Sequence, residues 1–252
     1  MTTTTAAERT TGPSTAPAHT GSPASRVLGI VAAAGVVALF VMALAVTPAD
    51  EVQGEAVRML YIHVPAAISM YVCAVLLGVA SALWLRRRTR GWDVLAAASA
   101  EVGLVFTVLV LVTGMLWGRP TWGVYWVWDA RLTSTALLAV LLAGYLALRR
   151  VPADPVSRSR RSAIAGLLLV VDLPIIKWSV DWWRTLHQDE TLTIPDAKID
   201  GIMLFTLFLG LVVGVLVTTW LLVHRFRVAW LEEEVEQGGL DVALAERRAE
   251  AG

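Results

Sequence analysis

The chain has 252 residues, of which 56% are hydrophobic and 17% charged, and its mean hydropathy is +0.64. This composition is too apolar for an ordinary soluble domain. The 21 basic and 21 acidic side chains balance, so the charge gives no indication of a nucleic acid or of a strongly acidic partner.

In chain order, a segment rich in Thr, Ala, Pro and Ser comes first, and residues 1–26 are therefore expected to be a disordered cytoplasmic tail. Six apolar runs follow. A helix of about 20 residues crosses a hydrocarbon core of about 30 Å, and backbone groups in lipid are satisfied within such a helix. The expected spans are Val27–Val46, Leu60–Leu85, Val94–Leu116, Leu132–Leu148, Ala163–Ile176 with some extension, and Ile202–Val223. The sequence therefore predicts an all-α integral membrane protein with six transmembrane helices.

The expected domain organisation is a membrane domain over 27–225 and a cytoplasmic C-terminal tail over 226–252, helical in part. Residues 43–45 read Ala-Leu-Ala and mimic a signal-peptidase site. The apolar run before them is longer than the h-region of a signal peptide, so the first run is expected to remain a helix. Cys73 is the only cysteine, which excludes an intramolecular disulfide.

Basic residues gather after alternate spans. Most of the 21 Lys and Arg lie in the two tails and in three short segments: 86–90, 149–161 and 224–227. Because cytoplasmic loops carry the excess of Lys and Arg, both termini are expected in the cytoplasm. Three loops are then expected on the outer face: 47–59, 117–134 and 178–201.

The second of these loops, 117–134, reads WGRPTWGVYWVWDARLTS and contains four tryptophans interrupted by two glycines and a proline. Tryptophan often lies at the level of the lipid headgroups, which explains the tryptophans near the inner boundary. It explains less well why seven of the 11 tryptophans are expected outside. An aromatic platform for a flat, apolar ligand is the alternative, and the tryptophans alone do not decide between the two.

Two of the four histidines flank this segment: His63 at the outer end of the second span, and His187 in the third outer loop. Two imidazoles complete an octahedral site around haem iron. Either histidine alone would more often be an interfacial hydrogen-bonding residue, but the pair on one face favours bis-histidine haem binding. A cytochrome b that carries electrons buries its histidines within its spans, so these positions favour a protein that hands haem over.

Charged residues near the same face have several expected roles. Four arginines are candidates to pair with haem propionates, because guanidinium groups match carboxylates: Arg58, Arg119, Arg131 and Arg184. For any of them except Arg131, a solvated loop position suits equally well. Asp129 precedes the fourth span and is expected to cap that helix. Asp172 lies within a span, which suggests either a function or a buried structural contact, and Glu101 is expected to reach interfacial water.

The segment 117–134 resembles the tryptophan-rich WWD signature of haem-handling proteins in cytochrome c biogenesis. The branches of that group differ after the Trp-Asp pair: a haem-lyase branch continues with a Pro-Val-Glu-Asn type sequence and the system II synthases with Pro-Lys-Glu. Here Asp129 is followed by ARLTS, which is similar to the CcmC branch. IHVPAA at 62–67 and LPIIKWSVDWWRTLHQ at 173–188 also resemble CcmC. Over roughly 27–225, the chain is identified as a member of that family.

The resemblance implies that His63 and His187 are the axial ligands of a transiently bound haem b. It implies a platform of seven residues: Trp117, Gly118, Trp122, Trp126, Trp128, Asp129 and Arg131. It further implies that haem is presented to the chaperone CcmE on the outer face of the bacterial cytoplasmic membrane, towards the periplasm or cell exterior. The other implied partners are the ABC transporter proteins CcmA and CcmB and the small protein CcmD. Where this chain has Asp172, the family pattern suggests a neutral polar residue such as Asn.

The expected mechanism is a clamp in which tryptophan faces stack on the porphyrin, each burying about 150–250 Å² of its own surface. One vinyl edge stays open, and the chaperone supplies the nucleophile. The chain is therefore expected to be a delivery protein that assists haem attachment, and not an enzyme. Two rivals remain. The ARLTS continuation argues against a WWD-type lyase or synthase acting on apocytochrome c, and the depth of the histidines argues against a membrane cytochrome b.

Overall fold

The computed structural model describes residues 21–183, 186–187 and 201–250. Within these residues all regular elements are helices, and six stretches are long and apolar enough to cross a membrane. They are Pro23–Val46, Glu55–Arg87, Arg90–Trp122, Ala130–Arg150, Pro155–Trp182 and Gly201–Glu236. The prediction of an all-α protein with six transmembrane helices is thus confirmed. Most of the tail expected at 1–26 lies outside the described residues.

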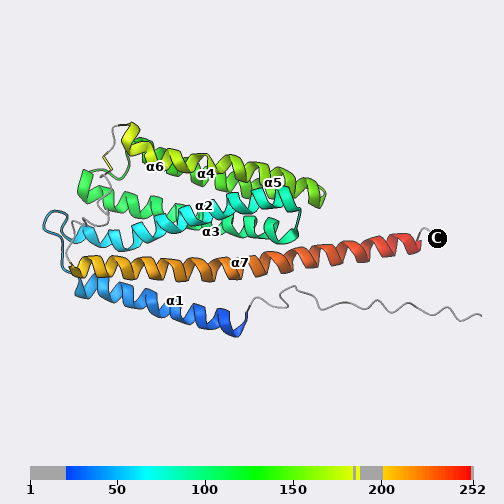
Figure 1. The fold of residues 1–252 in the computed structure, drawn as a ribbon, viewed down its shortest axis with the longest axis horizontal. Coiled ribbons are helices and arrows are strands. Elements are labelled where there is room, and N and C mark those ends of the chain that lie inside the picture. Colours follow the sequence, from blue (N-terminus) through cyan, green and yellow to red (C-terminus); the bar gives the residue numbers. More distant parts are fainter. Residues whose placement is uncertain (1–20, 184–185, 188–200, 251–252) are drawn as a thin grey trace, which may run out of the picture.

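The helices run side by side along one direction (Figure 1). The centre of the bundle is the pair α2 (Leu60–Arg87) and α3 (Arg90–Trp122), which make the most extensive helix–helix contact. One side of this pair is covered by α4 (Ala130–Arg150), α5 (Pro155–Val170) and α6 (Asp172–Trp182).

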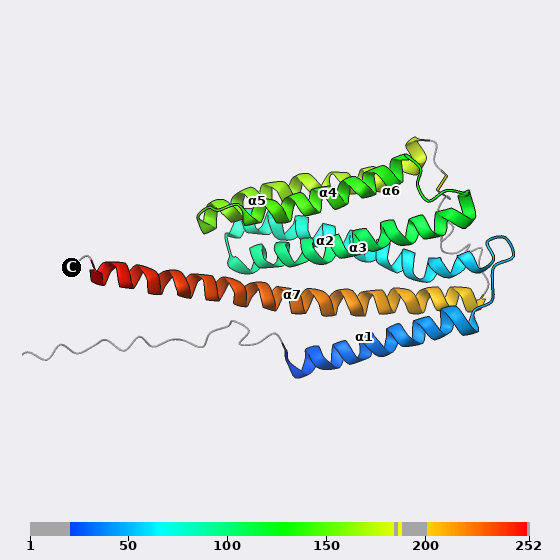
Figure 2. The ribbon, with the colours of Figure 1, turned by 180° about the vertical axis from the view of Figure 1, so that it is seen from behind.

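The other side of the central pair is covered by α7 (Gly201–Glu250). The first helix, α1 (Pro23–Val41), packs mainly on α7 and is the outermost of the bundle in both ribbon views (Figures 1 and 2). It continues as a π-helical turn, Met42–Val46, and a 3-10 helix, Glu55–Met59, leads into α2.

Small residues let the central helices approach closely, as is usual at helix interfaces in membranes. A Cβ atom at Gly103 of α3 would lie 3.1 Å from the Cβ of Cys73 on α2. One at Gly210 of α7 would lie 2.8 Å from the carbonyl oxygen of Tyr61 on α2. These contacts hold α3 and α7 against α2, and α2 carries His63.

The fifth span is longer than the expected Ala163–Ile176 and is interrupted at Val171, between α5 and α6. Pro174 lacks the N–H that would bond to the carbonyl of Val170 in a continuous helix, which accounts for the break. Asp172 begins α6 just after it. Its side chain is buried, and neither carboxylate oxygen has a hydrogen-bond partner among the described residues.

Two boundaries differ from those expected. The loop expected over 117–134 is confined to residues 123–129, because α3 continues to Trp122 and ends at Gly123, whose φ of 80° favours glycine. At the C-terminus, α7 does not stop near residue 225 but runs as one helix to Glu250 and projects beyond the bundle (Figure 1).

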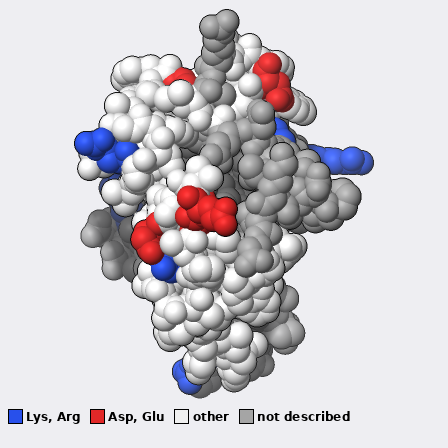
Figure 3. Space-filling model, turned by 90° about the vertical axis from the view of Figure 1, so that its left-hand side faces the viewer, with Lys and Arg blue, Asp and Glu red and all other residues white. Residues whose placement is uncertain are grey.

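The two ends of the bundle differ in charge. The arginine end carries the three basic segments. There Glu233 of α7 accepts hydrogen bonds from Arg90 of α3 and Arg158 of α5. Glu101 pairs with Arg225 on α7, and its side chain stays 32% exposed, so the expected contact with interfacial water stays a prediction. The histidine end carries residues 47–59, 123–129 and 186–187, and the described residues on its face are mostly uncharged (Figure 3). Which end faces the cytoplasm stays a prediction.

Candidate haem site

His63 lies in the first turn of α2, at the histidine end of the bundle. Its Nδ1 is 3.0 Å from Oγ1 of Thr113 on α3. The ring of Trp117, one turn further along α3, meets it edge-on with 5.8 Å between ring centroids. A Cβ atom at Gly114 would come within 3.2 Å of the Cε1 of His63. The glycine therefore makes room for the imidazole against α3.

His187 follows α6 and comes to the same place from the other side of the bundle. Its ring tilts against that of Trp122, with 5.4 Å between centroids. Burial is the main cause that lowers the pKa of His187 to about 4, and the positive charge of Arg131 acts in the same direction. The imidazole is consequently neutral at pH 7, which is the form that binds a metal.

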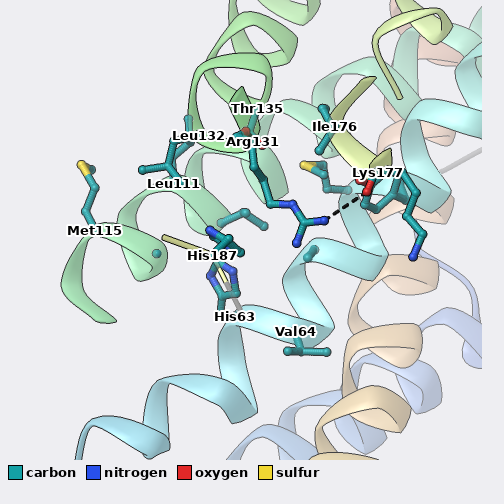
Figure 4. A pocket seen from close by; sticks show the side chains of 15 residues that line it. His63, Val64, Leu111, Met115, Arg131, Leu132, Thr135, Ile176, Lys177 and His187 are labelled. Atoms are coloured by element: carbon teal, nitrogen blue, oxygen red, sulfur yellow. Dashed lines mark hydrogen bonds between the residues drawn. The ribbon is translucent and has the colours of Figure 1, made fainter. Parts of the chain in front are cut away.

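The two histidines share one cavity of about 270 Å³ between α2, α3, α4 and α6 (Figure 4). Its inner part, towards the middle of the bundle, is lined by Met70, Tyr71 and Thr135. Pockets that enclose a drug-sized ligand usually measure about 300–1,000 Å³. A porphyrin would therefore be held in this cavity only in part, with the rest of the ring outside it.

Arg131 lines the cavity from the first turn of α4. Its Nη2 donates to the carbonyl oxygen of Lys177 on α6, at 3.1 Å. Its Nε is buried and has no acceptor among the described residues. Figure 4 shows the guanidinium lying between the histidines and Lys177, whose side chain also lines the cavity.

The other arginines expected on this face are engaged elsewhere or lie outside the described residues. Arg58 donates to the carbonyl oxygens of Ala43 and Thr47, at the end of the first span, and pairs with Glu55. Arg119 donates to the carbonyl oxygen of Gly123 and lies over the ring of Tyr125. Arg184 lies outside the described residues.

The expected platform separates into two groups. Trp117, Gly118 and Trp122 lie on the last turns of α3, next to the histidines, and a Cβ atom at Gly118 would lie 3.0 Å from the ring of Trp122. Trp126 and Trp128 lie in the following loop and meet each other edge-on at 5.4 Å. Trp128 is 83% exposed. Of the seven expected platform residues only Arg131 lines the cavity, and none of the four tryptophans does.

Asp129 has the helix-capping position expected for it. Its Oδ1 accepts a hydrogen bond of 2.8 Å from the backbone N–H of Leu132 at the start of α4. This cap satisfies an N–H that the helix leaves without a partner, and it fixes the point at which the loop enters α4. Asp129 thereby holds Arg131 at the mouth of the cavity.

Three further residues at the site were not singled out from the sequence. Thr113 contacts His63, Gln53 accepts a hydrogen bond of 2.8 Å from Nε1 of Trp117, and Lys177 lines the cavity. Lys177 lies within the segment 173–188, so its position in that motif was an available signal. The sequence gives no such signal for Thr113 or Gln53, because each contact joins two separate elements of the fold.

The comparisons with known proteins agree on one family. Residues 9–240 match the family described as heme exporter protein C, CcmC. The chain is 47% identical to heme exporter protein C of Bradyrhizobium diazoefficiens over 167 residues, which cover 65% of this chain and 63% of the relative. It is 45% identical to heme exporter protein C of Escherichia coli K12 over 144 residues, 57% of this chain and 59% of the relative.

A plant relative is matched over a larger part of its length. This is a putative cytochrome c biosynthesis ccmC-like mitochondrial protein of Arabidopsis thaliana, 34% identical over 206 residues, which are 77% of each chain. With the two bacterial relatives the match spans less than two thirds of their length. Because the family match covers nearly the whole chain and the six helices agree with it, this protein belongs to the heme exporter protein C (CcmC) family.

Proposed function

We propose that this protein binds haem b transiently at the histidine end of the bundle and presents it to the haem chaperone CcmE during cytochrome c maturation. The observation that carries the proposal is that one cavity is lined by His63, His187 and Arg131, which come from three separate parts of the chain. The names of two relatives, which refer to heme export and to cytochrome c biosynthesis, also support a role in haem handling.

The residues present fit a haem with two axial imidazoles. His63 and His187 line one cavity from separate parts of the chain, and the rings of Trp117 and Trp122 contact them. A bound haem supplies an iron that accepts two nitrogen ligands and a vinyl group that can be attacked. The chain itself holds, orients and partly covers the ring, while the chaperone supplies the nucleophile. In this proposal the protein is a delivery component and not an enzyme.

Arg131 suits the propionate edge. A guanidinium forms paired hydrogen bonds with a carboxylate, and the Nε of Arg131 is a buried donor without an acceptor in the described structure. Lys177 adds a second cation to the same cavity wall. In this proposal these two side chains would hold the propionates, and a vinyl edge away from them would stay open to the chaperone.

The cavity can enclose only a small part of the porphyrin, and this favours release of the haem. Its volume of about 270 Å³ is below that of pockets that surround a ligand. In addition, Trp128 of the loop 123–129 is 83% exposed. A membrane cytochrome b that carries electrons would retain its haem between histidines in the middle of its spans, whereas His63 lies in the first turn of α2 and His187 beyond α6.

We further infer the setting from the charge pattern. With the arginine end in the cytoplasm, the site faces the periplasm or the cell exterior from the bacterial inner membrane. The partners expected from the family resemblance are CcmE as the acceptor, CcmA and CcmB as the transporter, and CcmD. A WWD-type lyase or synthase is the alternative, and it differs in that it would act on apocytochrome c.

The test is an absorption spectrum of the purified protein, co-expressed with the chaperone, as wild type, His63→Ala and His187→Ala. We expect a six-coordinate, low-spin haem in the wild type, and loss of that spectrum and of chaperone loading in both variants. His224→Ala is the matched control, because His224 packs against Trp220 on α7, far along the chain from the cavity-lining residues. Unchanged spectra and loading in the first two variants would overturn the proposal.

A further inference from the structure

Thr113 is the residue whose hydroxyl contacts His63. It lies on α3, one turn before Trp117, and its side chain is buried. Its Oγ1 is 3.0 Å from Nδ1 of His63 on α2. Either atom of such a pair can in principle donate, because a histidine nitrogen and a hydroxyl both have donor and acceptor forms. The other neighbours of the hydroxyl decide which one does.

The hydroxyl hydrogen of Thr113 is directed to its own helix. Oγ1 lies 2.7 Å from the carbonyl oxygen of Leu109 and 3.3 Å from that of Val110. Carbonyl oxygens only accept, and a hydroxyl has a single hydrogen to donate. Threonine in a buried helix commonly donates it to the carbonyl four residues earlier. The oxygen then faces Nδ1 of His63 with a lone pair, so Nδ1 carries the hydrogen of this contact.

A neutral imidazole has one N–H, so a proton on Nδ1 leaves Nε2 with a free lone pair. Nε2 is then the nitrogen available to an iron. In metal sites, the ligating histidine almost always donates its other N–H to a fixed acceptor, which sets the tautomer and the ring orientation. Thr113 is such an acceptor on this chain.

Packing around the ring keeps this arrangement in place. Gly114 lies directly beneath it, since a Cβ there would come within 3.2 Å of Cε1, and Trp117 closes another side at 5.8 Å. Trp117 is itself fixed by the hydrogen bond from its Nε1 to Oε1 of Gln53 in the loop before α2. All of these neighbours are compatible with a ring that points Nδ1 towards α3.

We propose that Thr113 is a positioning residue for haem ligation: its hydroxyl oxygen accepts the Nδ1 hydrogen of His63 and so holds the imidazole with Nε2 free to bind iron. This inference rests on the proposed function for the iron, but the tautomer that it assigns is a property of the protein without haem.

The first experiment therefore uses the haem-free protein. The chain has four histidines, so selective ¹⁵N labelling in lipid nanodiscs gives few signals, and His63→Ala identifies the one from His63. We expect a neutral His63 with its hydrogen on Nδ1 in the wild type and in Thr113→Ser, and loss of that single state in Thr113→Val. A wild-type His63 with its hydrogen on Nε2 overturns the inference, even if the protein binds haem.

The second experiment loads haem and compares the same variants. Loss of an outer partner typically weakens metal affinity by about 10- to 100-fold. We therefore expect Thr113→Val to retain haem less well by that factor. Its reduction potential should also be more positive, because the imidazole becomes a poorer donor to ferric iron. Thr113→Ser should restore both properties. A merely structural role of the threonine would change stability but not the potential.

Thr107→Val is the matched control, because Thr107 is fully buried on the same helix and also donates to the carbonyl four residues earlier, that of Gly103. It should keep the wild-type haem affinity and potential. If Thr113→Val behaves like Thr107→Val, the inference is wrong while the proposed function stands. If the wild type binds no haem, the proposed function fails, and the ¹⁵N result still tests the assigned tautomer.

Discussion

Arg131 differs from the other described arginines of the histidine end in the direction of its guanidinium. Arg58 and Arg119 each donate to carbonyl oxygens of their own neighbourhood in the chain. Arg131 instead reaches from α4 to the carbonyl of Lys177 on α6, and its Nε remains buried without an acceptor in the described structure. A buried donor of this kind is unfavourable until an acceptor arrives, so it favours binding of a carboxylate.

We predict that Arg131→Gln weakens haem retention by about tenfold or more, because hydrogen bonds to charged groups contribute about 1.5–3 kcal/mol and 1.4 kcal/mol is a factor of ten. Haem titration of the purified protein measures this. The dimethyl ester of haem, which lacks propionate charge, should bind to the wild type and to Arg131→Gln with similar affinity. Arg119→Gln is the control and should change neither titration. A loss of equal size for haem and its ester would show that Arg131 does not contact the propionates.

The sequence motifs indicated some of the residues that gather at this cavity and missed others for a physical reason, while their binding of haem stays a prediction. His63, His187 and Arg131 do meet at one cavity, and Asp129 does cap α4, because each lies within a short segment whose pattern signals it. Thr113 could not be predicted in this way. Its partner is 50 residues away on another helix, and only the packing of α2 against α3 brings the two together.

At the scale of helices, α7 is fixed to the bundle at both ends of its membrane-spanning part. Near the histidine end, Gly210 lies against Tyr61 of α2. At the arginine end, Glu233 accepts from Arg90 at 3.0 Å and Arg158 at 2.9 Å, so that one carboxylate joins α7 to α3 and α5. Next to this group, Arg149 of α4 forms two hydrogen bonds with Asp93 of α3.

We predict that Glu233→Gln destabilises the protein by about 1–3 kcal/mol, because hydrogen bonds to charged groups are lost where the side chains are mostly buried. Thermal unfolding in detergent should show a lower Tm. The haem spectrum should be unchanged, since Glu233 lies at the opposite end from the histidines. Glu236→Gln is the control: its side chain is 71% exposed and 3.8 Å from Arg158, so the loss should be small. A changed haem spectrum in Glu233→Gln would show that the two ends are coupled.

The boundaries of helices were harder to predict than their existence. The six apolar runs were sufficient to find the spans. The segment from Trp117 to Trp122 was interpreted as a loop because of Gly118 and Pro120, yet it continues α3. Within the helix, Gly118 lies against the ring of Trp122, four residues further on. A glycine and a proline near the end of a long helix are thus weak signals of where it stops.

For the whole molecule, the separation of charge between the two ends is the main indication of how it lies in the membrane. The basic segments after α2, α4 and the spanning part of α7 all come to the arginine end, where several of their side chains pair with glutamates of α7. At the histidine end the described residues are mostly uncharged (Figure 3). The excess of cations would therefore face the cytoplasm, which leaves the cavity and the exposed tryptophans on the outer side.

Labelling of introduced cysteines tests this orientation directly. Val52 lies in the loop before α2 and is 93% exposed, whereas Ala153 lies in the exposed loop between α4 and α5. The two variants are Val52→Cys and Ala153→Cys. We predict that a membrane-impermeant maleimide labels the first variant in spheroplasts and the second only after the membrane is permeabilised. The parent chain is the control, because its single cysteine, Cys73, is fully buried and should not react. The reverse pattern would put the haem site on the cytoplasmic side, and delivery to an outer chaperone would then be impossible without transport through another protein.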